Sequence, residues 1–203
     1  MRGTLHKWAF FLFLGLGAWL VLAQRSGRWW PAALFAASVV GLFGTSALYH
    51  RVSWSPVWYR RMRRLDHTMI FALIVGTYTP VFLVALDGQG VDWVFATVCA
   101  VAAVGALVTV FWPSAPKWVR SLIYVSVGWI GAVVMPDVID AIGWSGFAML
   151  IGGGLVYSVG AAVYALKRPD PFPKIFGYHE IFHALVIAAV GMHYACIAFW
   201  VLA

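Results

Sequence analysis

The last apolar stretch of the chain begins with Tyr178-His179-Glu180-Ile181-Phe182-His183. In a helix, residues four apart lie on one face and about 6 Å apart along the axis, so the imidazoles of His179 and His183 can converge on one metal ion. Residues 184–203 are almost all apolar, which places this pair at the end of a membrane-spanning helix. Because an ionisable side chain at membrane depth is costly, the pair is interpreted first as functional.

The composition of the whole chain is that of a polytopic membrane protein. Of its 203 residues, 63% are hydrophobic and 10% are charged, and the mean hydropathy is +0.87. A chain with so few charges cannot cover a soluble globular surface. The net charge of +7 comes from basic residues in short segments between apolar runs, so we expect membrane lipids and no nucleic acid as partners. Cys99 and Cys196 lie inside apolar runs and predict no disulfide framework.

Seven apolar runs predict an all-α fold, a seven-helix membrane bundle that forms one domain over residues 1–203. The expected spans are 8–24, 29–50, 66–86, 91–112, 118–135, 142–166 and 178–201. Residues 51–64 are expected to form a basic loop. The basic start of the first run also fits a signal peptide, but no small-residue cleavage site follows it, so we expect a retained helix.

Basic and acidic residues separate between the two sides of the predicted bundle. With the amino terminus inside, 12 of the 14 basic residues fall in inner segments, whereas Asp87, Asp92, Asp137 and Asp140 fall outside. The excess of Lys and Arg on one side predicts an amino terminus in the cytoplasm and a carboxyl terminus outside. We therefore expect an integral protein of a bacterial-type inner (cell) membrane.

This topology brings ionisable residues from three helices to the inner side of the membrane. The second span ends at His50, the third begins at Asp66, and the seventh begins with His179 and His183. Three imidazoles and one water complete a tetrahedral zinc site with an open position, which is typical of catalytic zinc. Zinc lowers the pKa of its bound water to about 7. Ser46 lies one helical turn before His50 on the same face. Asp66 and Ser46 would then orient that water or a ligand imidazole.

Three motifs in this order carry a resemblance to a known family. They are Ser46-Ala47-Leu48-Tyr49-His50, then Asp66-His67-Thr68-Met69-Ile70-Phe71 leading into Gly76-Thr77-Tyr78-Thr79-Pro80, then His179-Glu180-Ile181-Phe182-His183 with His193 beyond. With them the chain resembles the hemolysin III family of the progestin and adipoQ receptor superfamily, and it is similar more distantly to the alkaline ceramidases. The resemblance extends from the second span to the seventh.

The resemblance implies a seven-helix bundle with an inside amino terminus and a Zn²⁺ ion near the cytoplasmic face. It implies His50, His179 and His183 as the ligands, Ser46 as their neighbour and Asp66 beside the zinc-bound water. The segment 2–7 departs from the family pattern, because it lacks the acidic and asparagine residues common among relatives. The sequence suggests no partner for His6 in this segment.

Several of these residues have a competing structural interpretation. Asp66 in a first helical turn would favour the helix macrodipole, and Ser46 could bond a carbonyl one turn earlier. His193 lies about 15 Å beyond His183, too far to share a metal, and is expected to bond another helix or line a cavity. His67 faces about 100° away from Asp66 and is expected to be an interface residue.

Four functions compete for this chain. The leading hypothesis is hydrolysis of an amide or ester bond in a lipid substrate, with Asp66 handling the proton. The second is a non-catalytic protein of membrane homeostasis, or a receptor-like sensor, in which zinc is structural. A pore is disfavoured because no span has a continuous polar face. An intramembrane metalloprotease is the fourth, since the segment 179–183 matches the pattern in which Glu180 would be the general base, although no carboxylate besides Asp66 could be its third ligand.

Overall fold

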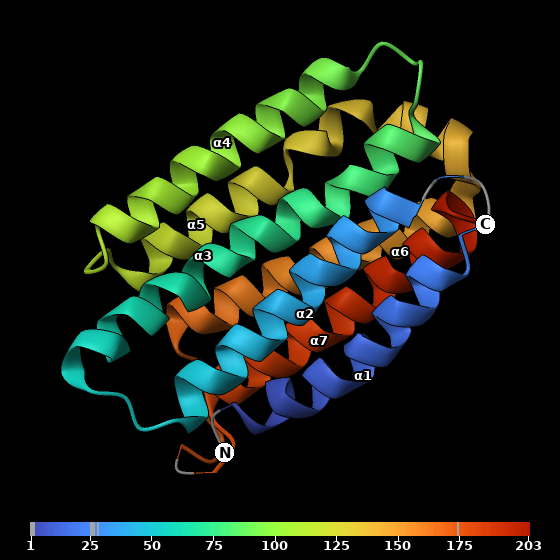
Figure 1. Cartoon of the computed structure of the whole chain (residues 1–203). Coiled ribbons are helices and arrows are strands. Elements are labelled where there is room, and N and C mark those ends of the chain that lie inside the picture. Colours follow the sequence, from blue (N-terminus) through green and yellow to red (C-terminus); the bar gives the residue numbers. More distant parts are fainter. Residues whose placement is uncertain (1–2, 25–26, 28, 174) are drawn as a thin grey trace.

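A computed structural model describes residues 3–24, 27, 29–173 and 175–203, and this part of the chain is helical with no strand. Its helices lie side by side in one bundle, with the two chain ends at opposite ends of it (Figure 1). The α-helices are α1 (Thr4–Leu22), α2 (Trp29–Arg51), α3 (Pro56–Pro80), α4 (Asp92–Phe111), α5 (Lys117–Gly128), α6 (Met135–Leu166) and α7 (Tyr178–Cys196). Three short segments continue them, namely the π-helical η1 (Val81–Ala85), the 3-10 helical η2 (Ile130–Val134) and the π-helical η3 (Ile197–Val201).

Six helical runs within the described residues are long and apolar enough to cross a membrane. They are Thr4–Leu22, Trp29–Arg51, Pro56–Ala85, Asp92–Phe111, Lys117–Leu166 and Tyr178–Val201. All-helical architecture is the expected solution in lipid, because each helix satisfies its own backbone hydrogen bonds. The all-helical membrane fold predicted from the sequence is thus confirmed.

The run Lys117–Leu166 differs from the others because it holds two α-helices, α5 and α6, joined through η2. As a straight helix its 50 residues would measure about 75 Å, more than twice the hydrocarbon thickness of about 30 Å. The helical path breaks at η2 and again at Gly143, where φ is 68° and ψ is 170°. At these breaks the chain turns back, so that α5 packs against α6.

Helix α1 packs against both helices that carry the histidine motifs, α2 and α7. The Tyr194 hydroxyl, in the last turn of α7, donates to the Leu16 carbonyl of α1 at 2.9 Å. Phe13 of α1 lies against Phe43 of α2 and against Tyr194, with ring centroids 5.4 and 6.0 Å apart. The amino-terminal helix is therefore part of the core around α2 and α7.

Helix α3 begins ten residues earlier than the predicted span, so the expectation of a loop over 51–64 is wrong from Pro56 onward. The Ser55 hydroxyl accepts from the backbone N–H of Trp58 at 3.5 Å, and Pro56 occupies the first helical turn. Arginine is a good helix former, so the helix continues beyond its apolar part. Asp66 consequently lies well inside the helix, and the macrodipole explanation for this residue is wrong as well.

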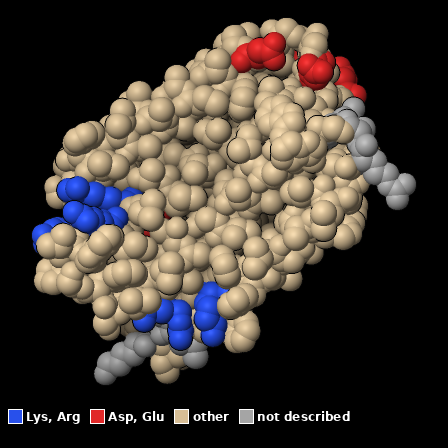
Figure 2. Space-filling model, viewed as in Figure 1, with Lys and Arg blue, Asp and Glu red and all other residues tan. Residues whose placement is uncertain are grey.

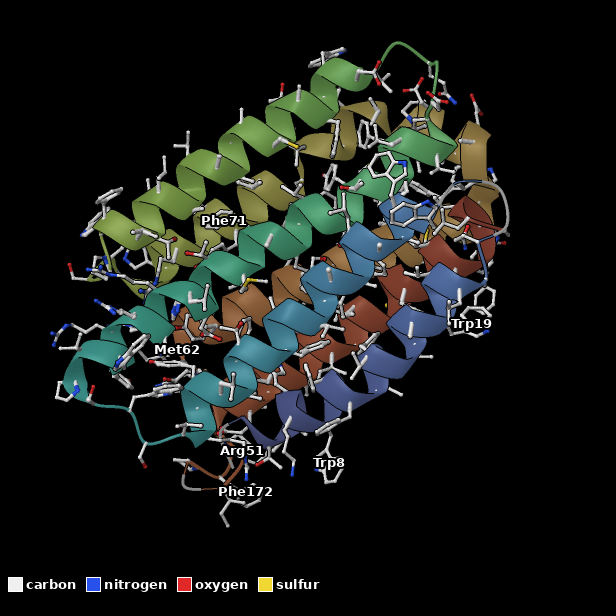
Figure 3. All side chains as sticks on the ribbon, in the orientation of Figure 1. Trp8, Trp19, Arg51, Met62, Phe71 and Phe172 are labelled. Atoms are coloured by element: carbon white, nitrogen blue, oxygen red, sulfur yellow. The ribbon has the colours of Figure 1, made fainter. Side chains whose placement is uncertain are left out.

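The charged residues visible in Figure 2 separate along the long axis of the bundle. Lys and Arg gather at the end where the amino terminus lies, and most of the visible Asp and Glu atoms gather at the opposite end. The same end holds the last residue of α2, Arg51, and the segment before α7, which contains Phe172 (Figure 3). The histidine motifs therefore lie at the basic end of the bundle.

Candidate metal centre

Three histidines from two helices meet at the basic end of the bundle. The last turn of α2 supplies His50, and the first two turns of α7 supply His179 and His183. One ring nitrogen of each lies within 4.8 Å of those of the other two. The Nε2 atoms of His50 and His179 are 3.3 Å apart. The structure thus brings together the three residues singled out from the sequence.

The chemistry of this donor set fits a divalent transition metal. Neutral imidazole suits zinc, copper, iron and nickel, and three imidazoles leave one position of a tetrahedral zinc shell open. Nitrogens that bind one tetrahedral zinc at about 2.05 Å lie about 3.3 Å from one another, which is the separation of the His50 and His179 nitrogens. Metal binding by this cluster remains a prediction that the geometry favours.

The start of α7 is held in place by two carboxylates. The buried Glu180 accepts the backbone N–H of Gly177 through Oε2 at 3.0 Å, and Asp170 accepts the N–H of Tyr178 through Oδ1 at 3.0 Å. These bonds satisfy donors that a helix start leaves unpaired. Glu180 therefore caps the helix that presents His179, which is a different role from the general base of the metalloprotease pattern.

Asp66 lies beside the face of α2 that carries His50. Its carboxylate interacts with the hydroxyl of Ser46, one helical turn before His50, and its side chain is 16% exposed. The His67 ring, expected to point away, lies with Nδ1 3.5 Å from Asp66 Oδ2 and 2.7 Å from the Arg63 carbonyl. Asp66 is not among the converging ligand atoms, so the geometry favours a neighbour of the centre rather than a ligand.

Aromatic and basic side chains from two further helices, α5 and α6, and from the first residue of α7 surround the histidine end. The Tyr164 ring of α6 lies 5.9 Å from the His179 ring. Lys117 of α5 lies 4.4 Å above the Tyr164 ring and donates to the Tyr178 hydroxyl at 2.7 Å. Sequence reasoning missed these residues, because no spacing along the chain relates the start of α5, the end of α6 and the start of α7.

His6 is the second feature that sequence reasoning missed. It lies in the first turn of α1, is 3% exposed, and stacks on the His183 ring with centroids 3.8 Å apart and ring planes at 9°. Within the described part of the chain neither ring nitrogen has a hydrogen-bond partner, beyond a weaker contact with the His183 backbone. The available signal was an ionisable residue at the edge of an apolar run, which is by default a functional candidate.

His193 lies farther along α7 and serves packing. Its Nε2 donates to the Leu150 carbonyl of α6 at 3.0 Å, and its ring lies 5.4 Å from that of Tyr157. The prediction that His193 bonds another helix is confirmed. It also borders an apolar pocket that is lined by residues of α3, η1, η2 and α6.

Comparison with known proteins shows the family to which the chain belongs. The family model described as "Haemolysin-III related" matches residues 1–194. Hemolysin-3 of Bacillus cereus is 30% identical over 170 residues, covering 83% of this chain and 74% of that protein. The hemolysin-3 homolog of Bacillus subtilis is 26% identical over 184 residues, covering 89% and 83%. The adiponectin receptor protein of Drosophila melanogaster is 30% identical over 181 residues, covering 80% of this chain and 40% of that protein. The chain is an integral membrane protein that belongs to the haemolysin-III-related family of the progestin and adipoQ receptor superfamily.

Proposed function

We propose that this protein is a membrane-embedded, zinc-dependent hydrolase that cleaves an amide or ester bond of a membrane lipid. The observation that carries the proposal is the convergence of His50, His179 and His183, whose ring nitrogens lie within 4.8 Å of one another. Three imidazoles with one open position are typical of catalytic zinc, whereas structural zinc has four protein ligands. The open position is where a substrate carbonyl or a water would enter.

The proposed topology has seven crossings, with the amino terminus in the cytoplasm of a bacterial-type cell. The run Lys117–Leu166 crosses twice in this proposal, which its 50-residue length and its break at Gly143 support. The gathering of Lys and Arg at the histidine end supports a cytoplasmic location for that end (Figure 2). The centre then lies near the cytoplasmic edge of the inner membrane, within reach of both water and lipid ester or amide groups.

The side chains around the centre have distinct tasks in this proposal. When bound, Zn²⁺ supplies a Lewis acid for the substrate carbonyl and lowers the pKa of a water. The Asp66 carboxylate accepts the proton of the attacking water and delivers it to the leaving amine or alkoxide. Ser46 holds the Asp66 carboxylate in place through its hydroxyl, an interaction already present in this structure.

The metal assignment is tested by the metal content of purified wild type beside His50→Ala, His179→Ala and His183→Ala. We expect about one zinc per wild-type chain and almost none in the three variants, because two remaining imidazoles hold zinc weakly. His193→Ala is the matched control, since it removes a buried histidine of α7 outside the cluster. Retention of zinc by all three variants would exclude the cluster as the site.

The hydrolase assignment is tested with Asp66→Ala and Ser46→Ala on ceramide-like amides and phospholipid esters. We expect Asp66→Ala to keep its zinc and to lose activity by about 10²–10⁴-fold, the typical contribution of a positioned acid–base group. Ser46→Ala should lose less, because it acts through Asp66. Zinc-loaded wild type that cleaves no such substrate would leave only the binding proposal standing.

A second candidate is a non-catalytic protein in which the metal holds helices together. This candidate is favoured because the proposed ligands come from two helices that are far apart in the sequence. His50 lies in the last turn of α2, and His179 and His183 lie in the first two turns of α7, so one ion would join the two helices. In this case His50→Ala should lower the unfolding temperature as much as removal of the metal, while Asp66→Ala should leave every measurable property nearly unchanged. The Asp66 variant therefore separates the two candidates.

A further inference from the structure

The first turn of α1 contacts the last turn of α2, next to the three histidines His50, His179 and His183. The Thr4 hydroxyl accepts from Arg51 Nη1 at 2.9 Å. Gly3 has a φ of +77°, and a Cβ at this position would meet the His50 Cβ at 2.8 Å. Trp8 near the start of α1 and Arg51 lie at the same end of the bundle in Figure 3. This turn therefore forms one wall of the cluster.

His6 is the residue of this turn that touches a ligand candidate. Its ring lies face to face with that of His183, at a centroid distance of 3.8 Å. The Phe43 ring makes an edge-type contact with the His6 ring, at a centroid distance of 5.0 Å. Within the described residues the ring nitrogens of His6 have no partner beyond the weak contact with the His183 backbone. Packing against the Phe43 and His183 rings therefore does most to fix the orientation of the His6 ring. The same packing fixes His183 in return.

The stacking geometry excludes His6 as a fourth ligand in this arrangement. A metal lies close to the plane of each imidazole that binds it, about 2.0–2.1 Å from the nitrogen. The two ring planes are nearly parallel, at 9°, so an ion bound by the His183 ring would not be within ligand reach of the His6 ring. His6 can act on the metal only through His183.

We propose that His6 is a positioning residue of the metal centre, and that the amino-terminal turn of α1 is thereby a functional part of it. The inference rests on the proposed metal binding by His50, His179 and His183. Rotation about the Cβ–Cγ bond of histidine has a broad minimum, so the contacts on the faces of the His183 ring influence its orientation. Stacking against His6 restricts that rotation and keeps the donor nitrogen directed at the centre.

The stack also responds to the metal itself. A divalent ion draws electron density from the ring that binds it, so the bound His183 ring becomes electron-poor and is attracted more strongly by a neutral aromatic face, as a cation is. Only such a difference between the metal-bound and metal-free states can change metal affinity. An aliphatic side chain at position 6 would fill the space and lose this difference.

The test compares His6→Leu and His6→Phe with wild type and with His193→Leu, a matched buried histidine of α7. Zinc affinity is measured by chelator competition, and the cobalt-substituted proteins are compared by their visible absorption spectra. We expect His6→Leu to bind one zinc with about 10–100-fold lower affinity, the usual effect of a residue behind a metal ligand, with an altered cobalt spectrum. The zinc affinity of His6→Phe, which keeps an aromatic face, should stay within about threefold of the wild-type affinity. The zinc affinity of His193→Leu should equal that of wild type.

Each other result overturns this inference in a recognisable way. If His6→Leu has the zinc affinity and the cobalt spectrum of wild type, the stacking of His6 on His183 does not affect the metal centre. Complete loss of zinc from folded His6→Leu, as expected for His183→Ala, would make His6 a ligand. Wild type without zinc would overturn the proposed function and this inference together. The unfolding temperatures of the metal-free proteins separate all of these from a failure to fold.

Discussion

The two ends of α7 both carry buried histidines, yet they use them differently. At its amino end the nitrogens of His179 and His183 lie within 4.8 Å of a nitrogen of His50. Toward its carboxyl end the Nε2 of His193 donates to the Leu150 carbonyl. The first end faces the last turn of another helix with its own histidine, whereas the second faces the glycine-rich surface of α6, where Gly153 lies against the His193 ring.

This contrast teaches that burial of an imidazole does not by itself indicate function. A neutral histidine carries one donor and one acceptor nitrogen, and a backbone carbonyl satisfies the donor without any metal. The functional signal is the meeting of several ring nitrogens. The following variants break or sharpen this distinction between the amino end of α7, which carries the proposed ligands His179 and His183, and its carboxyl end, which carries His193.

The largest expected effect is that of metal removal. At free zinc 100-fold above the dissociation constant, binding to the native state stabilises it by about 2.7 kcal/mol, which raises the unfolding temperature of a chain of this size by about 5–10 °C. A chelator should therefore lower the unfolding temperature of wild type and His193→Ala by this amount, and that of His179→Ala hardly at all. An equal chelator effect on His179→Ala would place the metal elsewhere.

Two glycine variants probe the two ends by the same chemical change. Gly153→Ala forces a methyl group against His193 and should cost about 1–3 kcal/mol of unfolding free energy with unchanged zinc affinity. Gly3→Ala places a methyl group against His50 at a φ of +77°, and should lower zinc affinity about tenfold as well. Unfolding in detergent and chelator competition measure the two quantities. A loss of zinc affinity in Gly153→Ala would contradict the separation of the two ends.

A smaller effect is expected at the start of α7, where Glu180 caps the helix. Glu180→Ala leaves the Gly177 N–H without its acceptor and should cost about 0.5–2 kcal/mol of unfolding free energy. Glu180→Gln keeps an acceptor oxygen and should retain both stability and hydrolysis. Loss of hydrolysis in folded, zinc-loaded Glu180→Gln would instead support the general-base role of the metalloprotease pattern.

The smallest effect is expected for His193→Phe. It removes the hydrogen bond to Leu150, and bonds between membrane helices contribute about 0.6 kcal/mol on average. We expect the unfolding temperature to change by no more than about 2 °C, with full zinc content. His183→Phe is the matched variant at the amino end of α7, and by the proposed metal binding it should contain almost no zinc.

The candidate site could be predicted largely because its residues follow helical spacing and membrane topology. The four-residue interval between His179 and His183, and the placement of His50 at the inner end of its span, are readable from the sequence. The start of α3 could not be predicted in this way. The arginines after Pro56 have the low hydropathy that is typical of a loop, although arginine is a good helix former. His6 escaped because stacking between α1 and α7 joins residues 177 positions apart, which no local spacing encodes.

The sequence by itself determined an all-helical membrane protein with two histidine motifs at the basic end of its spans. Apolar length and the distribution of charge suffice for this, since lipid admits only helices with satisfied backbones and the basic residues collect on one side. Only the tertiary structure decided which nitrogens meet, that Glu180 caps its own helix, and that α1 closes the cluster with His6. Those features depend on helix rotation and side-chain packing, which hydropathy and spacing along one chain do not fix.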